Sequence, residues 1–170
     1  MKTKLLFDFQ VDRKSSTITM QREFLASVEM VWKAWTTPEI IEKWMAPKPM
    51  VVQTKAMDFR EGGFWHFALA SPQGKKYWCR YDYEEIESLK LITELRAYSD
   101  ENGLVPTDFL RTKCVNLFKQ AGEKTLVTMN AKYASSEVFQ MMSSQAHMQG
   151  FSSTLVNLDR LLIDLVKDMK

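Results

Sequence analysis

The span from Arg22 to Pro47 constrains the fold more than any other part of the sequence. It opens in an alternating polar and apolar run that predicts a strand, and Ser27 follows where a helix N-cap residue is expected. Apolar residues then recur at the helical spacing i, i+3, i+4 and i+7, at Val28, Val31, Trp32 and Trp35. A strand followed at once by an amphipathic helix is therefore predicted here.

A second helix follows after almost no connection. Thr37-Pro38 ends the first helix and begins the next, because proline suits the first helical position. The apolar face of this second helix consists of Ile40, Ile41, Trp44 and Met45, and Pro47 ends it. The span thus predicts strand, helix, tight turn and helix.

The rest of the chain alternates between strand patterns and turn signals. Strands are predicted at residues 16–25, 50–59, 63–70, 76–87, 90–99, 109–118 and 125–133. Residues 1–14 are mixed in character and are expected to form a frayed or added edge. Residues 135–169 are expected to be helical, with a break near residues 146–150. The apolar stripe of this last helix is Phe151, Leu155, Leu158, Leu162 and Leu165.

The pattern resembles the START-like (SRPBCC, helix-grip) superfamily, and within it the bacterial branch named after the activator of the heat-shock-protein-90 ATPase. The matching residues are Arg22, Phe24, Ala26, Val31, Trp32, Ala34, Trp35, Thr36, Pro38, Glu39, Trp44 and Pro47. Weaker matches are Gly62-Gly63, Pro72-Gln73-Gly74 and Gly150-Phe151. The sequence departs from the family where Tyr81 replaces a usual glycine and where Phe151 replaces a tryptophan.

This resemblance implies a single START-like domain over residues 1–170. Its class is α+β, with a helix-grip (START/Bet v-like) order β-α-α-β6-α, in which a curved antiparallel sheet wraps around a long C-terminal helix. A cavity can remain between that sheet and the helix. A chain of 170 residues can bury enough surface to fold as one domain without disulfides or metals.

Composition excludes several classes of function. The net charge of +2 is small and the basic residues are dispersed, so no nucleic-acid partner is expected. No apolar run approaches the roughly 20 residues of a membrane span, and Asp8 and Asp12 interrupt any signal-peptide core. Cys79 and Cys114 are interpreted as buried thiols of a reducing compartment, with a disulfide as the lesser alternative. A cytoplasmic protein, monomeric or homodimeric, is expected.

Strand parity suggests which side chains face the cavity, because alternate strand residues point to opposite faces. The predicted ligand-pocket lining is Trp44, Trp65, Phe67, Tyr81, Tyr83, Glu85, Met129, Tyr133, Met148, Phe151 and Leu155. A concave apolar chamber with a few polar groups is the usual form of a small-molecule site, and the alternative is that these residues simply fill the core. Glu85 is interpreted as a structural partner of Tyr83 or Arg96 rather than as a catalytic base.

No catalytic constellation or metal site is predicted. His66 and His147 lie far apart in the sequence, and neither has the spacing of a metal ligand with Cys79 or Cys114. His66, with Asp58 nearby, could act in acid–base chemistry, but a histidine on the solvent-facing side of a sheet is the commoner case. No cofactor motif is present.

Three functions remain open. The favoured one is a module that binds a hydrophobic or aromatic small molecule between the sheet and the last helix. The second is an enzyme of the polyketide-cyclase or aromatase kind, in which Tyr81, Tyr83, Glu85 and His66 would be the acids and bases. The third is a co-chaperone-like interaction protein, which the family name implies and which would have a chaperone as its partner. The lack of a matched acid–base pair favours binding over catalysis.

Overall fold

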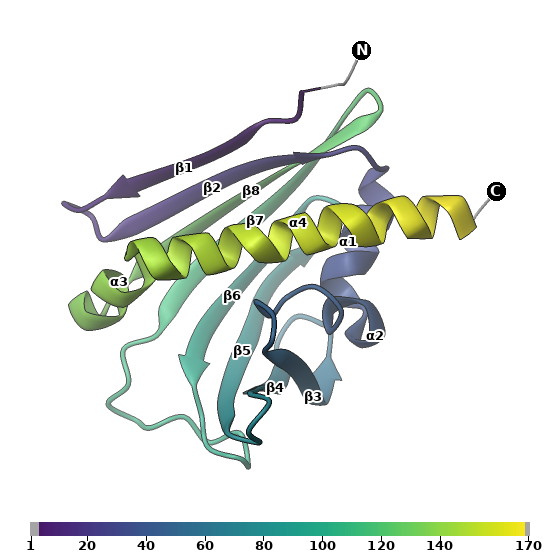
Figure 1. Cartoon of the computed structure of the whole chain (residues 1–170). Coiled ribbons are helices and arrows are strands. Elements are labelled where there is room, and N and C mark those ends of the chain that lie inside the picture. The colour runs from purple at the N-terminus through teal and green to yellow at the C-terminus, as the bar shows by residue number, and fades with distance from the viewer. Residues whose placement is uncertain (1–3, 169–170) are drawn as a thin grey trace.

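The computed structural model describes residues 4–168, and these form one curved sheet with a long helix across it (Figure 1). The strands are β1 (Phe7–Asp12), β2 (Thr17–Phe24), β3 (Val51–Asp58), β4 (Phe64–Ala70), β5 (Lys76–Glu87), β6 (Leu91–Tyr98), β7 (Thr112–Ala121) and β8 (Lys124–Tyr133). The helices are α1 (Val28–Thr36), α2 (Pro38–Ile41), α3 (Ser136–Met142) and α4 (Gln145–Asp168).

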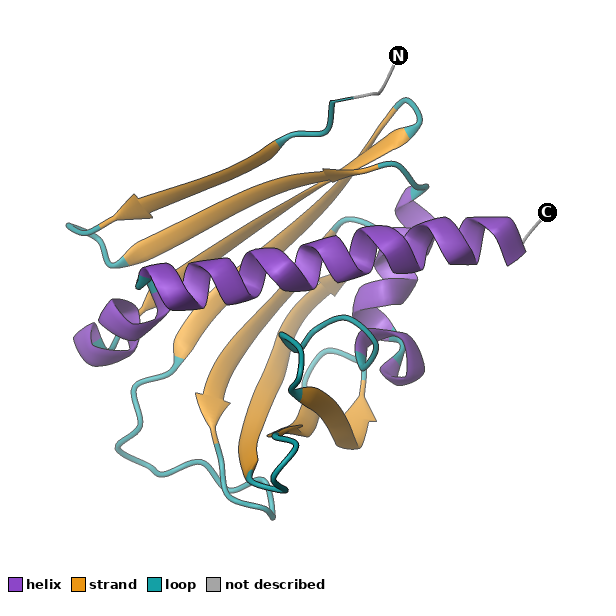
Figure 2. Ribbon diagram, viewed as in Figure 1, coloured by secondary structure: helices purple, strands orange, loops and turns teal. Residues whose placement is uncertain are grey.

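The eight strands are antiparallel throughout and follow the order β1-β2-β8-β7-β6-β5-β4-β3. Helix α4 crosses the concave face of this sheet (Figure 2), which confirms the predicted helix-grip class. The difference from the predicted order lies at the N-terminus. Residues 7–12 pair with β2 as an added edge strand, so the chain opens with a hairpin rather than with a single strand.

Helices α1 and α2 close one end of the sheet. The Ser27 hydroxyl accepts from the Met30 amide at 3.3 Å, which caps α1 as predicted. The rings of Trp35 and Trp44 lie 4.7 Å apart, and the Trp44 indole N–H donates to the Ala34 carbonyl at 2.9 Å. The ring centre of Phe118 on β7 lies 5.5 Å from that of Trp35. This end of the molecule is therefore filled by aromatic side chains.

The C-terminal helix breaks earlier than predicted. Helix α3 ends at Met142, and the Ser144 hydroxyl accepts from the His147 amide at 3.4 Å at the start of α4. The prediction of a break near residues 146–150 is wrong, because Gly150 lies inside α4, where it faces the Pro47 ring. Met169, the last residue of the predicted helix, lies outside the described residues.

A β-bulge toward the end of β5 changes the side-chain alternation along that strand. The pairing register with β6 shifts between Tyr83 and Ile86. At the same place the Tyr83 amide donates to the Gly63 carbonyl at 2.9 Å, and the Tyr83 carbonyl accepts from Gly62. Gly63 has no room for a side chain, because a Cβ there would lie 2.0 Å from the Asp58 carbonyl oxygen. The bulge decides which of the following residues can face the concave side.

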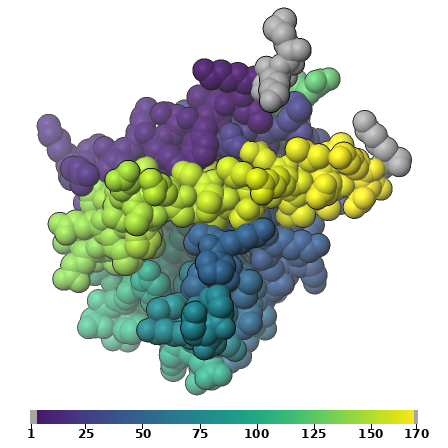
Figure 3. All heavy atoms as spheres, in the orientation of Figure 1, coloured from purple at the N-terminus to yellow at the C-terminus, as the bar shows by residue number. Residues whose placement is uncertain are grey.

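Side chains cover the concave face. In the space-filling view α4 forms a continuous ridge between the β1–β2 hairpin and the segment that follows α2 (Figure 3). Arg22 of β2 forms an ion pair with Asp159 of α4, which ties the helix to the sheet. No helix within residues 4–168 combines the length and apolar character needed to cross a membrane.

Candidate functional site

A cavity of about 490 Å³ lies between the concave face of the sheet and the first half of α4. This volume falls within the range of roughly 300–1,000 Å³ that is typical of small-molecule sites. Its apolar walls include Met20, Phe67, Leu69, Met129, Val138, Met142 and Phe151. The sheet, α3, α4 and the segment after α2 all contribute, so only the complete fold creates the cavity.

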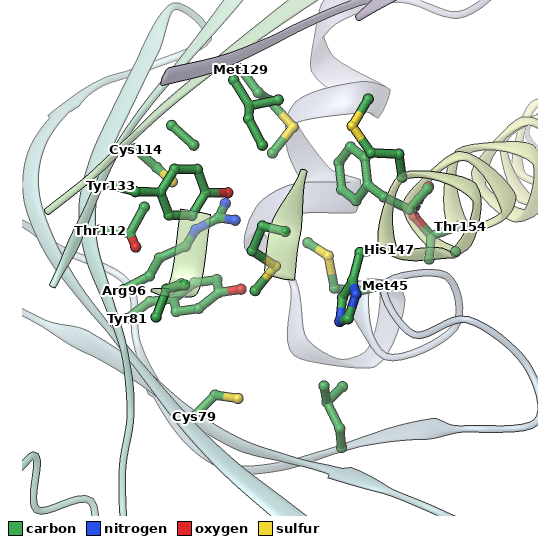
Figure 4. Close-up of a pocket in the computed structure, with 18 of the residues that line it drawn as sticks. Met45, Cys79, Tyr81, Arg96, Thr112, Cys114, Met129, Tyr133, His147 and Thr154 are labelled. Carbon is green, nitrogen blue, oxygen red and sulfur yellow. Dashed lines mark hydrogen bonds between the residues drawn. The ribbon is translucent and has the colours of Figure 1, made fainter. Parts of the chain in front are cut away.

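A row of polar side chains crosses the sheet wall of the cavity. Tyr81 pairs with Arg96, Arg96 with Thr112, and Thr112 with Tyr133, on the neighbouring strands β5, β6, β7 and β8. All four line the cavity, and Figure 4 shows them grouped on one wall. We call these residues the polar row.

Arg96 is held in place from one side. Its Nε and Nη2 donate to the same oxygen of Glu94, at 2.9 and 2.6 Å. That oxygen also accepts from the amide of Asn116 at 3.3 Å, and Asn116 is fully buried. The guanidinium carbon lies 4.4 Å from the centre of the Tyr81 ring. The ion pair and the ring together fix the orientation of the guanidinium in the wall.

Burial keeps the phenols and thiols in and around this wall protonated. Desolvation raises the pKa of Tyr133 to about 12 and raises those of Tyr81 and Tyr83 further. Burial likewise raises the pKa values of the Cys79 and Cys114 thiols to about 11. The phenols therefore offer O–H donors at neutral pH, and the thiols are poor nucleophiles there.

The opposite wall is formed by α4 and by the segment after α2. His147 at the start of α4 is exposed and also lines the cavity, and its Nδ1 lies 3.1 Å from the Ser144 hydroxyl. Met45 and Met50 line the cavity near it, and Figure 4 shows Met45 and His147 together, across from Arg96. Because His147 is exposed and lines the cavity, the cavity reaches the solvent at this edge.

Some of the predicted pocket residues line the cavity, and the others lie in the filled core or, for Glu85, at the surface. The residues that line the cavity are Phe67, Tyr81, Met129, Tyr133, Met148 and Phe151. Those outside its lining are Trp44, Trp65, Tyr83, Glu85 and Leu155. Trp44 packs on Trp35, and Trp65 stacks on Phe67 with 3.8 Å between ring centres. Leu155 is fully buried in the core.

Glu85 and Tyr83 lie outside the lining for different reasons. The bulge after Tyr83 reverses the alternation at Glu85, which is exposed. Its amide donates to the Thr93 hydroxyl at 2.9 Å. The carboxylate that serves Arg96 is Glu94, on the same strand as Arg96 and two residues before it. Tyr83 is buried against Phe59, with 5.0 Å between the ring centres.

The predicted lining did not include Arg96 or Thr112, and Glu94 was not recognised as the partner of Arg96. The available signal was the pairing of β6 with the tyrosine face of β5: a strand placed beside Tyr81 and Tyr83 must turn two of its own alternate residues to the same side. Glu94 and Arg96 are those residues. Charged residues are seldom assigned to a concave apolar face, so the signal was easy to pass over.

The two histidines have different surroundings, because His147 lines the cavity and His66 does not. His66 lies on the opposite face of β4 from the cavity-lining Phe67, yet it is only 4% exposed. The Nε2 of His66 lies 3.2 Å from the Asp100 carbonyl oxygen. Asp58, the acid suggested as its partner, forms an ion pair with Arg60 instead. Both cysteines are free. Within the described part of the chain, no three His, Cys, Asp or Glu side chains gather as metal ligands.

Comparison with known proteins gives a family and a set of folds. The family model described as "Activator of Hsp90 ATPase homolog 1-like protein" matches residues 25–162. No curated protein matches the sequence.

Several solved structures share the fold over nearly the whole chain. Protein Ms6760 from Mycobacterium smegmatis is similar with 26% identity and a TM-score of 0.81, covering 94% of this chain and 97% of its own. A solution structure from Arthrobacter aurescens has 21% identity and a TM-score of 0.83, covering 92% and 91%. Protein NE0264 from Nitrosomonas europaea has 22% identity and a TM-score of 0.79, covering 92% and 99%.

Proposed function

Because the chain belongs to the family of activator of Hsp90 ATPase homolog 1-like proteins, and because its grip encloses a cavity, we propose that it binds a hydrophobic or aromatic small molecule there. The observation that carries the proposal is the cavity of about 490 Å³, which is lined mainly by apolar side chains and has the polar row on its sheet wall. Such a lining gives affinity through burial and orientation through a few polar contacts.

The enzyme alternative lacks a matched acid–base pair in the described residues. Glu94 is hydrogen-bonded to Arg96 and Asn116 rather than to a tyrosine or histidine. His66 lies on the face opposite the cavity-lining Phe67, and His147 contacts Ser144. The geometry supports binding better than general acid–base chemistry.

The family description supplies the remaining alternative, which is an interaction with a chaperone ATPase. This function would act through a surface and would be independent of cavity occupancy. Stimulated ATP turnover on adding the protein to purified chaperone would support it. Unchanged turnover at excess protein would reject it.

Binding can be tested with Nile red, an uncharged dye whose fluorescence rises in apolar surroundings. The protein should give a saturable fluorescence increase with one dye per chain. Ala131→Trp should remove it, because Ala131 lines the cavity and a tryptophan there would occupy the space. The matched control is Ala56→Trp on β3, where the alanine is exposed.

The two variants separate the cavity from the surface. Equal dye binding by Ala131→Trp and by the unmodified protein would overturn the proposal, provided that both unfold cooperatively. Retained binding in Ala56→Trp and its loss in Ala131→Trp would support it.

A further inference from the structure

The polar row carries information about the ligand, because each of its side chains offers at least one hydrogen-bond donor. A guanidinium has five N–H groups, and the described Glu94 contacts use two of them, one on Nε and one on Nη2. No acceptor within residues 4–168 is hydrogen-bonded to Nη1 of Arg96, or to the hydroxyl of Tyr81 or Tyr133 (Figure 4). These donors border the cavity and lack a protein partner in the described chain.

The donors also keep their protons. Burial holds the pKa of Tyr133 near 12 and that of Tyr81 higher still. A ligand that reaches this wall therefore meets O–H and N–H groups, and it leaves them unsatisfied unless it supplies an acceptor oxygen. An unsatisfied buried donor costs about 1–3 kcal/mol, so a purely hydrocarbon ligand would be penalised here.

The charge of Arg96 is already balanced. Glu94 is 4% exposed and lies in the wall beside Arg96, so the pair carries no net charge. A ligand carboxylate would bring a second anion next to Glu94, and its loss of hydration would lack a free counter-ion. An uncharged carbonyl oxygen accepts from the same donors without that cost.

We propose that the ligand is an uncharged aromatic or alicyclic molecule with a carbonyl oxygen, which accepts from Arg96, Tyr81 and Tyr133 while the apolar body lies against Met129 and Phe151. This inference rests on the proposed binding function and names the ligand class of the same cavity. Glu94 acts as a positioning residue, since it orients the guanidinium and cancels its charge.

The test uses three naphthalenes substituted at the same ring position: acetonaphthone, ethylnaphthalene and naphthoate. They share one aromatic body and differ in carrying a neutral carbonyl, no acceptor or a carboxylate. Each is titrated against the complex of the protein with Nile red. Acetonaphthone should displace the dye at a concentration about tenfold lower than ethylnaphthalene, as expected for hydrogen bonds to a charged donor. Naphthoate should be weaker than acetonaphthone.

Variants locate the preference in the polar row. Tyr133→Phe and Tyr81→Phe each remove one hydroxyl without changing charge, and each should lower the preference for acetonaphthone over ethylnaphthalene by a few-fold. The affinity for ethylnaphthalene should stay unchanged or rise. Tyr77→Phe is the matched control, because Tyr77 lies on the same strand, is exposed and does not line the cavity.

The outcomes distinguish the two proposals. Equal displacement by acetonaphthone and ethylnaphthalene would overturn the carbonyl inference and leave small-molecule binding intact. Tightest displacement by naphthoate would overturn the inference that the ligand is uncharged. A protein that binds none of the dye would overturn both proposals. An unchanged preference in both Tyr→Phe variants would overturn the assignment of the carbonyl oxygen to Tyr81 and Tyr133.

Discussion

The two ends of the concave face differ in how the space under α4 is used. At the end closed by α1 and α2, Trp35, Trp44 and Phe118 pack against one another, and Leu158 is fully buried. At the other end, the polar row and the methionines leave a cavity of about 490 Å³. One sheet and one helix thus form both a filled core and an open chamber.

This difference shows where the stability and the specificity of the protein come from. Close packing at the filled end stabilises the fold, because protein cores reach the density of organic crystals. The cavity end forgoes such contacts and instead buries an ion pair, which contributes little net stability when its desolvation is counted. The comparison predicts that equivalent substitutions have different effects at the two ends.

The largest effect is expected at the filled end. Trp44→Ala should lower the free energy of unfolding by about 4 kcal/mol, because it removes a fully buried ring and its hydrogen bond to Ala34. Trp78→Ala, on a half-buried tryptophan of β5, is the control and should cost about 1 kcal/mol. Urea denaturation measures both. Similar costs for the two would show that the filled end is not the main source of stability.

Breaking the ion pair should have the next largest effect. Glu94→Ala leaves the Arg96 guanidinium in the wall without its counter-ion, and about 3 kcal/mol of stability should be lost. The double variant Glu94→Leu/Arg96→Met should recover most of that loss, since neither charge is then buried. A double variant as unstable as Glu94→Ala would mean that the pair itself stabilises the fold.

Aliphatic truncation gives the sharpest comparison of the two ends. Met129→Ala should cost about 2 kcal/mol, whereas Leu158→Ala should cost about 4 kcal/mol. Met129 borders the cavity and lacks neighbours on that side, while Leu158 is surrounded. Equal losses in chemical denaturation would indicate that the cavity end packs as tightly as the filled end.

Alkaline pH should weaken the cavity end gradually. The folded-state pKa of Tyr133 is about 12 against an ordinary value of 10.0, so the phenol contributes stability below about pH 10 that is lost as the pH rises toward 12. Tyr133→Phe should reduce the pH dependence by at most about 1.4 kcal/mol per pH unit across that interval. Unfolding free energies measured from about pH 9 to about pH 11 test this. An identical slope in Tyr133→Phe would contradict the assignment.

Much of the fold could be predicted from local patterns. The Arg22–Pro47 span contains a cap, a helix stripe and a proline start, each of which acts within a few residues, and the structure has α1 and α2 there. Helix α2 is shorter than predicted, because it ends at Ile41 and turns lead on to Pro47. Alternation placed Trp65, Phe67 and Leu69 on one face of β4, and Phe67 and Leu69 line the cavity. The edges of the cavity were harder to predict. Alternation along a strand tells which face of the sheet a side chain is on, but not whether it lies beside the cavity or in the filled core. Trp65 and Tyr83 are inward-facing strand residues but lie in the filled core.

The sequence by itself determined the strands, the capped helices and the family, because propensity, capping and alternation depend on near neighbours. Only the tertiary structure decided what lines the chamber. In β6, Leu91, Thr93, Leu95 and Ala97 form the more apolar alternate set, yet pairing with β5 and β7 turns Glu94 and Arg96 toward the concave side. A bulge in β5 removes Glu85 from that side. Strand register and bulges arise between strands distant in sequence, so local patterns do not contain them.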